Sequence, residues 1–322
     1  MEWSSQSTRR ITSSRYHRLA GHRPQPAARY DETVRLVAFF ALLVGVGSAC
    51  TGDPPPPPPR PATSIGAPDP HALHISGTGA MTPLMTLIAE EWTRRGGIPH
   101  VLIEESIGSG GGIRATYDGA IDLGMVSRPL SSEEQKLGLL TIAVGLDVVA
   151  LVAHPGLSTD DVRAGELPAL YRGEQTRFAS GAPAVPLLRD RAESANTALD
   201  RIVPGLQAAR EQAYRQRRHR VLYSDRAMAE AIAATPGSFG VFSLSWLLAY
   251  RLPLKILRID GQRPSPEAVQ QGRYAGSREL FFVVRPERLE RTTPLLAFLR
   301  KPDVQELIRS YGYVPAPEGK TR

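Results

Sequence analysis

The stretch that decides the fold runs from Ile107 to Leu130 and reads I-G-S-G-G-G-I-R-A-T-Y-D-G-A-I-D-L-G-M-V-S-R-P-L. It combines a glycine-rich turn, a short helix, an apolar strand over residues 121–126 and the pair Ser127-Arg128. Small residues let an anion approach the backbone closely, and a guanidinium binds an oxyanion through two hydrogen bonds. The stretch therefore predicts a wall of a binding site for a small anion.

Strands and helices alternate on both sides of this stretch. A strand over residues 73–76 precedes a helix over residues 84–92, and further strands are expected at 146–153 and 278–284. This alternation predicts an α/β fold with buried parallel strands. Two helix starts are also readable: Ser131 to Glu134 form a capping box, and Asp225 is expected to cap the helix that follows it.

Three segments share one design, in which a strand leads through small residues into a helix: 78–83, 108–113 and 193–197. A helix N-terminus offers unpaired N–H groups and a partial positive charge. Arg128 and Arg189 are candidates to bind a tetrahedral oxyanion. Side-chain donors are expected from Thr78, Thr82, Ser109, Ser127, Ser194 and Asn196.

The N-terminal region predicts export. An eleven-residue apolar run, Leu36–Val46, has the length of a secretory h-region and is too short to span a bilayer comfortably. The small residues Gly47-Ser48-Ala49 and then Cys50 follow it. Residues 1–50 resemble a bacterial lipoprotein signal with Cys50 as the lipidated residue, although Gly47 stands where such signals usually carry an aliphatic residue. The alternative is a plain signal peptide or an uncleaved anchor. We hypothesise that residues 1–33 are not translated and that synthesis starts near Val34.

Residues 51–70 form a linker with six consecutive prolines, a semi-rigid spacer of ~3 Å per residue. Charge is concentrated before the linker, since residues 1–49 carry seven arginines and three acids. The remaining 32 basic and 29 acidic residues are nearly balanced, so no nucleic-acid partner is predicted.

Enzyme chemistry finds little support in the sequence. No G-x-S-x-G elbow is present, and the seven histidines lack ligand spacing, so neither a catalytic residue nor a metal is predicted. Gly77-x-Gly79-x-x-Thr82 imitates a dinucleotide fingerprint, but Thr82 replaces its third glycine and no cofactor is expected. A secreted enzyme that acts on a phosphorylated substrate remains the least favoured reading.

From about Leu73 to Pro315 the chain resembles the solute-binding proteins of phosphate ABC transporters. The resemblance rests on motifs in a specific order: G-T-G-A-M-T-P-L-M, I-G-S-G-G-G-I, D-L-G-M-V-S-R-P-L, P-G-S-F-G-V-F, R-E-L-F-F-V-V, F-L-R-K-P-D-V-Q and Y-G-Y-V-P.

The resemblance implies a two-lobed periplasmic-binding-protein fold, in which each lobe is a mainly parallel sheet flanked by helices. The first lobe is expected to comprise residues 71–147 plus 277–322 and the second residues 148–276, with crossings near 147–150 and 276–280. Phosphate would bind between the lobes and be delivered to an ABC permease. The protein would be a monomer, lipid-anchored on the periplasmic or cell-surface side of a bacterial membrane, with no enzymatic activity.

The resemblance also implies site residues. The first lobe would contribute Ala80, Met81, Thr82, Ser109, Gly110, Ser127 and Arg128, and the second Ser194, Ala195, Asn196 and a preceding arginine. The spacing leaves Arg189 and Arg191 both open. The second-lobe turn reads Ser-Ala-Asn where the family usually has Ser-Gly-Thr, and Ser127 stands where some relatives place an aspartate that accepts the proton of hydrogen phosphate. Glu193 is a hypothetical substitute acceptor, and a module that binds or senses another oxyanion remains the alternative.

Overall fold

The computed structural model describes residues 71–316. The predicted signal region, Cys50 and the proline-rich linker lie outside these residues. Within the described part of the chain, none of the helices is long and apolar enough to cross a membrane.

The N-terminal part of the fold is a parallel sheet with helices on its connections. Strand β3 is buried at every position and pairs in parallel with β1, which confirms the predicted buried strand of the deciding stretch. Ser131 and Glu134 form the predicted capping box at α3. The elements are β1 (Ala72–Gly77), η2 (Gly79–Met81), α1 (Thr82–Arg94), β2 (His100–Ile103), α2 (Gly108–Tyr117), β3 (Leu123–Val126) and α3 (Ser132–Gln135).

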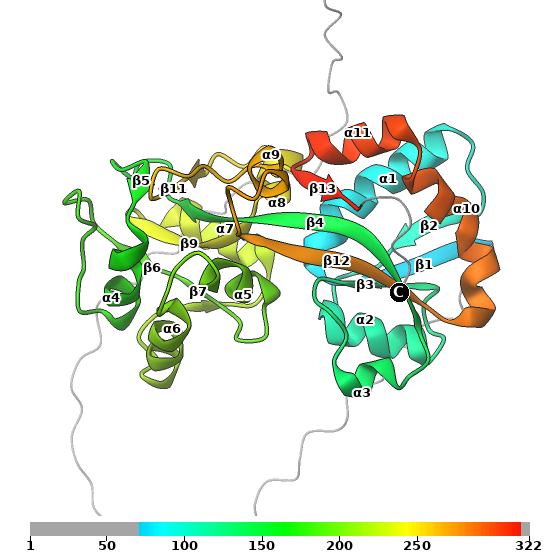
Figure 1. Ribbon diagram of the computed structural model, residues 1–322, viewed down its shortest axis with the longest axis horizontal. Coiled ribbons are helices and arrows are strands. Elements are labelled where there is room, and N and C mark those ends of the chain that lie inside the picture. The colour runs from blue at the N-terminus through cyan, green and yellow to red at the C-terminus, as the bar shows by residue number, and fades with distance from the viewer. Residues whose placement is uncertain (1–70, 317–322) are drawn as a thin grey trace, which may run out of the picture. The chain divides into compact units, whose positions relative to one another are not determined.

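Two antiparallel strands, β4 (Leu140–Ala153) and β12 (Ser277–Val284), lie side by side between two groups of helices (Figure 1). The sheet order is β2-β1-β3-β12-β4-β9-β6, with β10 and β13 also pairing with β4. One end contains the parallel strands β1, β2 and β3, and the other the parallel pair β6 and β9. This is the predicted α/β architecture, and β4 is the strand common to both ends. The residue bounds predicted for the lobes stay a prediction.

The segment between β4 and β12 builds the second group of helices. Gly173 ends α4 in the left-handed conformation, as its position after the helix pattern predicts. Helix α8 was not expected from the sequence, because its six residues, L-S-W-L-L-A, are too few to show a helical period. The elements are β5 (Asp161–Val162), η3 (Ala164–Glu166), α4 (Leu167–Arg172), β6 (Val185–Pro186), β7 (Leu188–Arg189), α5 (Ser194–Asp200), α6 (Leu206–Arg215), β8 (Val221–Leu222), α7 (Asp225–Ala234), β9 (Ser238–Ser243), α8 (Leu244–Ala249), β10 (Lys255–Ile256), β11 (Arg258–Ile259) and α9 (Pro266–Gln270).

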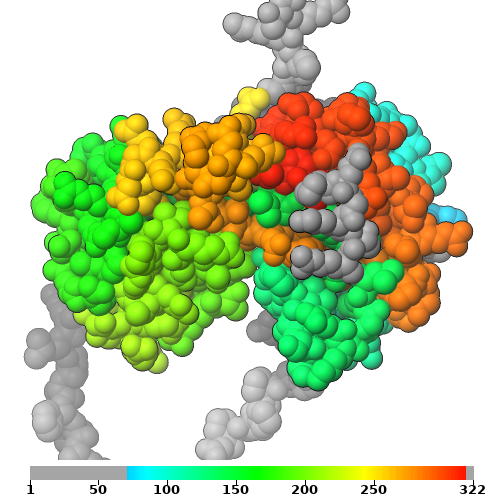
Figure 2. All heavy atoms as spheres, viewed as in Figure 1, coloured from blue at the N-terminus to red at the C-terminus, as the bar shows by residue number. Residues whose placement is uncertain are grey.

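After β12 the chain returns to the first group through η4 (Pro286–Arg288), α10 (Leu289–Leu299), α11 (Pro302–Ser310) and β13 (Tyr313–Pro315). Their apolar faces join the core that contains Leu73, Ile75 and Phe282, whereas Leu151, Tyr171 and Phe239 belong to a separate core. In the space-filling view, the surfaces of α2 and α3 (teal) and of α5 and α6 (green) are separated by a notch (Figure 2). The fold therefore places two walls around the middle of β4 and β12.

Charged residues lie where β4 and β12 meet. Asp147 and Arg278 are directly paired in the strand register, and their side chains are 0% and 4% exposed. Arg278 Nε donates to Asp147 Oδ2 at 2.9 Å, and the hydroxyls of Ser243 and Ser245 donate to the two carboxylate oxygens at 2.6 and 2.9 Å. A buried carboxylate with this many donors meets the general requirement that buried charges be paired.

Replacing Asp147 with Ala is expected to lower the free energy of unfolding by about 3–5 kcal/mol, because Arg278 then keeps a buried charge without its main partner. Urea unfolding of the purified protein measures this loss. Asp118→Ala, which removes an exposed ion pair with Arg114, serves as the control and should change stability by less than about 0.5 kcal/mol. Equal effects of the two substitutions would contradict the assignment of Asp147 as a buried structural charge.

Candidate functional site

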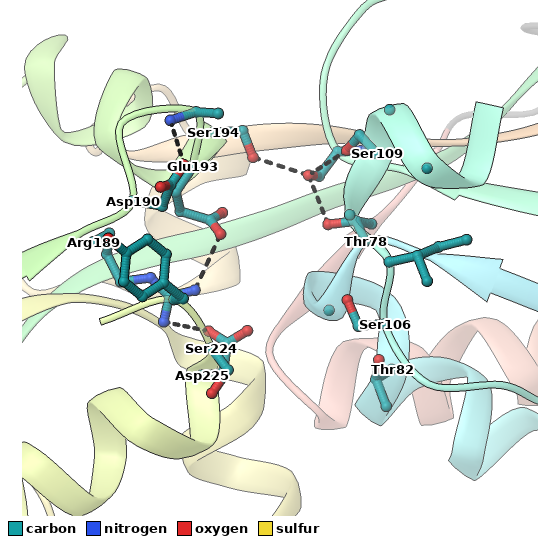
Figure 3. Close-up of a pocket in the computed structure, with 18 of the residues that line it drawn as sticks. Thr78, Thr82, Ser106, Ser109, Arg189, Asp190, Glu193, Ser194, Ser224 and Asp225 are labelled. Carbon is teal, nitrogen blue, oxygen red and sulfur yellow. Dashed lines mark hydrogen bonds and ion pairs between the residues drawn. The ribbon is translucent and has the colours of Figure 1, made fainter. Parts of the chain in front are cut away.

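A cavity of about 780 Å³ lies between the turns after β1, β2 and β3 and the segments around α5 and α7. A volume of this size is in the range of small-ligand sites. It is lined by Thr78, Gly79, Thr82, Glu104, Glu105, Ser106, Ile107, Gly108, Ser109, Gly110, Gly111, Ser127, Arg128, Arg189, Asp190, Ala192, Glu193, Ser194, Tyr223, Ser224, Asp225, Arg226 and Trp246. Figure 3 shows that the labelled polar side chains from the two sides point toward one another.

Glycines allow close backbone packing in the first wall of the cavity, which is formed by the turns after β1, β2 and β3. Gly77 ends β1 with φ of 138°, and a Cβ there would lie 2.1 Å from the carbonyl oxygen of Met125. Gly112 lets α2 pack on the end of β1, since a Cβ at this position would lie 2.9 Å from Gly77 Cα. The glycine-rich run of the deciding stretch thus packs the first turns of α2 against β1 and β3, which places Ser109 beside Ser127.

Four hydroxyls meet at the floor of the cavity, with Ser127 at their centre. Ser127 Oγ lies 2.9 Å from Thr78 Oγ1, 3.3 Å from Ser109 Oγ and 2.9 Å from Ser194 Oγ (Figure 3). The backbone N–H of Ser127 also donates to Ser109 Oγ at 3.1 Å. The contact between Ser127 and Ser194 joins the two walls directly. A small anion that enters here meets a concentrated set of O–H donors.

Arg189 supplies a buried positive charge on the second wall. Its side chain is 3% exposed and forms ion pairs with Glu193 at 3.0 Å and Asp225 at 3.3 Å (Figure 3). Its Nε and Nη1 atoms make no hydrogen bond to any described residue. Nη1 is the atom of the ion pair with Asp225, so Nε is the donor of this guanidinium that has neither a hydrogen bond nor an ion pair among the described residues.

The pKa values of the two carboxyl groups around Arg189, those of Glu193 and Asp225, are shifted in opposite directions. Burial raises the pKa of Glu193, but the charges of Arg278 and Arg189 and their hydrogen bonds outweigh it and bring the pKa to about 2. Burial raises the pKa of Asp225 above its ordinary value, and the opposing charge of Arg189 only reduces this effect. Glu193 is therefore an anion held by two guanidinium groups, whereas burial opposes the ionisation of Asp225 and Arg189 favours it.

The structure brings most of the predicted site residues to the cavity wall. Arg189 lies there, whereas Arg191 is 55% exposed and contacts Glu211 and the ring of Tyr214 outside it. The predicted residues on the wall are Thr78, Thr82, Ser109, Gly110, Ser127, Arg128, Arg189 and Ser194.

Four predicted residues, Ala80, Met81, Ala195 and Asn196, are buried but do not line the cavity. The N–H groups of Ala80 and Met81 donate to Oγ1 and O of Thr78, at 3.4 and 3.2 Å. The Asn196 amide donates to the carbonyl oxygen of Asp190 at 2.8 Å. These residues hold the turns in place, and their role as direct ligands stays a prediction.

Arg128 reaches the cavity wall with its charge already engaged. Its guanidinium makes two hydrogen bonds of 2.7 Å to Glu134, the residue that completes the capping box of α3. This interaction lowers the pKa of Glu134 to about 2, chiefly through the hydrogen bond from Arg128. Arg128 is consequently less available to an anion than Arg189.

Sequence reasoning missed several residues of the site. Asp225 was expected to cap α7, but the Ser224 hydroxyl is the cap, accepting from Ala227 N at 3.1 Å, and Asp225 faces Arg189 in the cavity wall. Trp246 lies on the unexpected helix α8, and its Nε1 donates to Gly79 O at 3.0 Å. Arg278 was assigned only to a strand. A charged residue within an apolar strand was the available signal, because such a residue needs a buried partner.

Within residues 71–316, no group of histidine, cysteine, aspartate and glutamate side chains is arranged to hold a metal ion. The described lining of the cavity also contains no histidine, cysteine or lysine. The chemistry of the site therefore rests on hydroxyls, backbone N–H groups, guanidinium groups and carboxylates.

Comparison with known proteins identifies relatives of the chain and of its fold. A family model described as a PBP superfamily domain matches residues 60–300. Phosphate-binding protein PstS 2 of Streptococcus pneumoniae is 34% identical over 107 residues, which cover 33% of this chain and 36% of the relative. PstS 2 of Streptococcus agalactiae is 28% identical over 104 residues, covering 32% and 35%. The match thus spans about a third of the length of these curated relatives.

Solved structures show the same fold. A Clostridium perfringens protein, assigned as a phosphate ABC transporter substrate-binding protein and solved with bound phosphate, aligns with a TM-score of 0.65 and 23% identity, over 76% of this chain and all of that one. An ABC-type phosphate transport receptor from Vibrio cholerae aligns with a TM-score of 0.55 and 19% identity, over 76% of this chain and all of that one. The two-lobed fold expected from the sequence is confirmed by these matches.

The pKa of Glu193 predicts a pH dependence of stability. Because the pKa falls from its ordinary 4.5 to about 2 in the folded protein, the ionised carboxylate stabilises the fold above pH 4.5. This stabilisation is lost as the pH falls toward 2. Between about pH 6 and pH 3 the unfolding free energy of the unmodified protein should fall by about 2 kcal/mol more than that of Glu193→Gln. Urea unfolding at a series of pH values measures the difference. Glu133→Gln, at an exposed site, should follow the unmodified protein.

Proposed function

The chain belongs to the PBP superfamily, and on this premise we propose that it binds inorganic phosphate in the cavity between its two walls and delivers it to an ABC permease. The observation that carries this proposal is Arg189, a guanidinium on the cavity wall that is 3% exposed and whose Nε makes neither a hydrogen bond nor an ion pair with any described residue. A planar guanidinium matches the spacing of two oxygens of a tetrahedral oxyanion. The relatives named for phosphate support the same ligand class.

The hydroxyl cluster complements Arg189. Ser127, Ser109 and Thr78 come from the first wall and Ser194 from the second, so one small anion can contact both walls at once. Such a ligand stabilises the arrangement in which the walls are together, which is the basis of ligand-driven closure. The buried hydroxyl of Thr82 also lacks a hydrogen-bond partner among the described residues and lies on the same cavity wall.

The charges around the site are compatible with an anion. Glu193 is paired with Arg189 and Arg278, so each of these arginines shares one negative charge. Asp225 pairs with Arg189 at 3.3 Å, and burial raises the pKa of its carboxyl group. Since Glu193 already accepts from two guanidinium groups, it is better placed to hold these arginines than to accept a proton from the ligand.

We propose no covalent chemistry for this protein. The cavity hydroxyls contact one another and N–H donors, and the described lining contains no histidine to activate them. This arrangement is suited to binding and release.

An organic phosphate is the second candidate ligand. One water molecule occupies about 30 Å³ in the liquid, and orthophosphate has five heavy atoms. The anion alone therefore fills only a small part of the 780 Å³ cavity. Tyr223, which is 76% exposed, and Ile107 add apolar surface to the lining. A phosphate monoester with a small organic group has room at this site.

We propose that the protein works outside the cytoplasmic membrane as a monomer, anchored by lipid on Cys50 and separated from the membrane by the proline-rich linker. The permease in this proposal receives phosphate from the cavity when the two walls separate. The apolar run, the small residues before Cys50 and the composition of residues 51–70 support this arrangement.

Isothermal titration of the purified protein with phosphate, sulfate, arsenate, molybdate, tungstate and glycerol phosphate tests the ligand proposal. Arg189→Met should weaken phosphate binding at least tenfold, because a charge-assisted hydrogen bond contributes about 1.5–3 kcal/mol. Arg191→Met is the matched control and should bind like the unmodified protein. Absence of heat with phosphate in the unmodified protein, or equal losses in the two variants, would refute this assignment.

Replacing Cys50 with Ser in the full-length protein should abolish incorporation of labelled fatty acid and release the protein from the membrane fraction of a bacterial host. The unmodified chain should be labelled and sediment with membranes. Labelling that persists in the variant would contradict lipidation at Cys50. If the unmodified chain is instead found in the soluble fraction with its signal peptide removed, the plain secretory alternative is favoured.

A further inference from the structure

We propose that Arg278 is a positioning residue of the binding site, which orients the Ser194 hydroxyl toward the ligand and ties it to the two strands shared by both walls. This inference rests on the proposed function. Arg278 does not line the cavity, so it would act through Ser194 and not by touching the ligand.

The first step of the argument is the reach of the Arg278 side chain. Nε bonds to Asp147 on β4, and Nη2 donates to Ser243 at the end of β9 at 2.6 Å. Nη1 leaves this cluster and donates to Ser194 Oγ at 3.0 Å and to the Glu193 carboxylate. One planar group therefore connects β4, β9 and the first residues of α5. A purely structural pair between β4 and β12 would not require the contacts of Nη1.

The second step is the direction of the hydrogen bonds. A guanidinium has donors only, so Ser194 Oγ accepts from Arg278 and its own proton remains free to point elsewhere. The nearest partner is Ser127 Oγ at 2.9 Å, toward the cavity. Arg278 thus holds the Ser194 hydroxyl so that its proton and its second lone pair remain for a partner on the side where the ligand is expected.

The other outer hydroxyls are arranged in the same way. Ser109 Oγ accepts from the Ser127 N–H at 3.1 Å, and Thr78 Oγ1 accepts from the Ala80 N–H at 3.4 Å. Each of the three hydroxyls around Ser127 therefore has one lone pair taken by an N–H group and keeps a proton and a second lone pair for Ser127 or a ligand. On the first wall, backbone N–H groups donate these hydrogen bonds to the hydroxyls. On the second wall, the donor to the hydroxyl is one side chain, Arg278.

The third step is rigidity. The Arg278 side chain is 4% exposed, and its ionised form is stabilised strongly: burial opposes the charge, but Asp147, Glu193 and Asp225 raise the pKa of Arg278 above its ordinary value. Its contacts fix the position of Ser194 relative to β4 and β12. A binding group held by such a supporting contact loses little freedom when the ligand arrives.

A double-mutant cycle in isothermal titration with phosphate tests this role. Arg278→Lys keeps the charge next to Asp147 but lacks the planar fork needed to reach Ser243 and Ser194 together. It should weaken phosphate binding about tenfold in the unmodified background. In the Ser194→Ala background the same change should weaken binding less than twofold, since the group through which Arg278 acts is already gone.

A gentler pair of variants keeps the test valid if Arg278→Lys does not fold. Ser243→Ala removes one hydrogen bond to Arg278 and should weaken binding roughly threefold through Ser194. Ser245→Ala is the matched control, because Ser245 bonds to Asp147 at 2.9 Å without a hydrogen bond to Arg278, and binding should be unchanged.

The outcomes separate this inference from the proposed function. If Arg278→Lys lowers phosphate affinity equally with and without Ser194, or lowers it in neither background, the positioning role of Arg278 is overturned. The proposal that the protein binds phosphate would still stand. If the unmodified protein gives no heat with phosphate, the proposed function itself fails. A loss confined to the background that retains Ser194 supports the positioning role.

Discussion

The binding region depends on the neutralisation of two guanidinium groups that are buried beside the cavity. Arg278 is enclosed between β4, β9 and α5, and Arg189 between Glu193 and Asp225. Taking such charges out of water costs several kcal/mol per ion unless carboxylates and hydroxyls surround them. The partners of Arg278 come from segments far apart in the sequence, so its charge is satisfied only when β4 and β12 are in register. Glu193 joins the two arginines into one network.

This network lies directly behind the hydroxyl floor. Ser194 contacts Arg278 on one side and Ser127 on the other, so the buried charges reach the cavity through one hydroxyl. The first wall needs no such support, because glycines at 77 and 112 let the backbone of β1 and α2 approach closely enough to place the other hydroxyls. One wall is thus built by backbone packing and the other by charge pairing.

The sequence was informative wherever a feature is local. The strand–helix alternation, the capping box at Ser131 and the glycine stop after α4 follow from residues a few positions apart, and the structure contains all three. The hydroxyls at Thr78, Ser109, Ser127 and Ser194 were also found, because each follows a strand. The roles of Arg278 and Asp225 were not, since their partners are 131 and 36 residues away, and no periodic pattern encodes such contacts.

The contrast between Arg128 and Arg189 explains why residue type alone did not identify the binding group. Arg128 follows β3, Arg189 is the last residue of β7, and both reach the cavity wall. Arg128 is neutralised by a carboxylate six residues later, through two hydrogen bonds of nearly ideal geometry. Arg189 has two acidic partners but retains donor atoms without hydrogen bonds, because Glu193 is shared with Arg278 and the contact to Asp225 is long. An arginine whose carboxylate serves a second guanidinium is left with binding capacity, and in this fold that condition is met at Arg189.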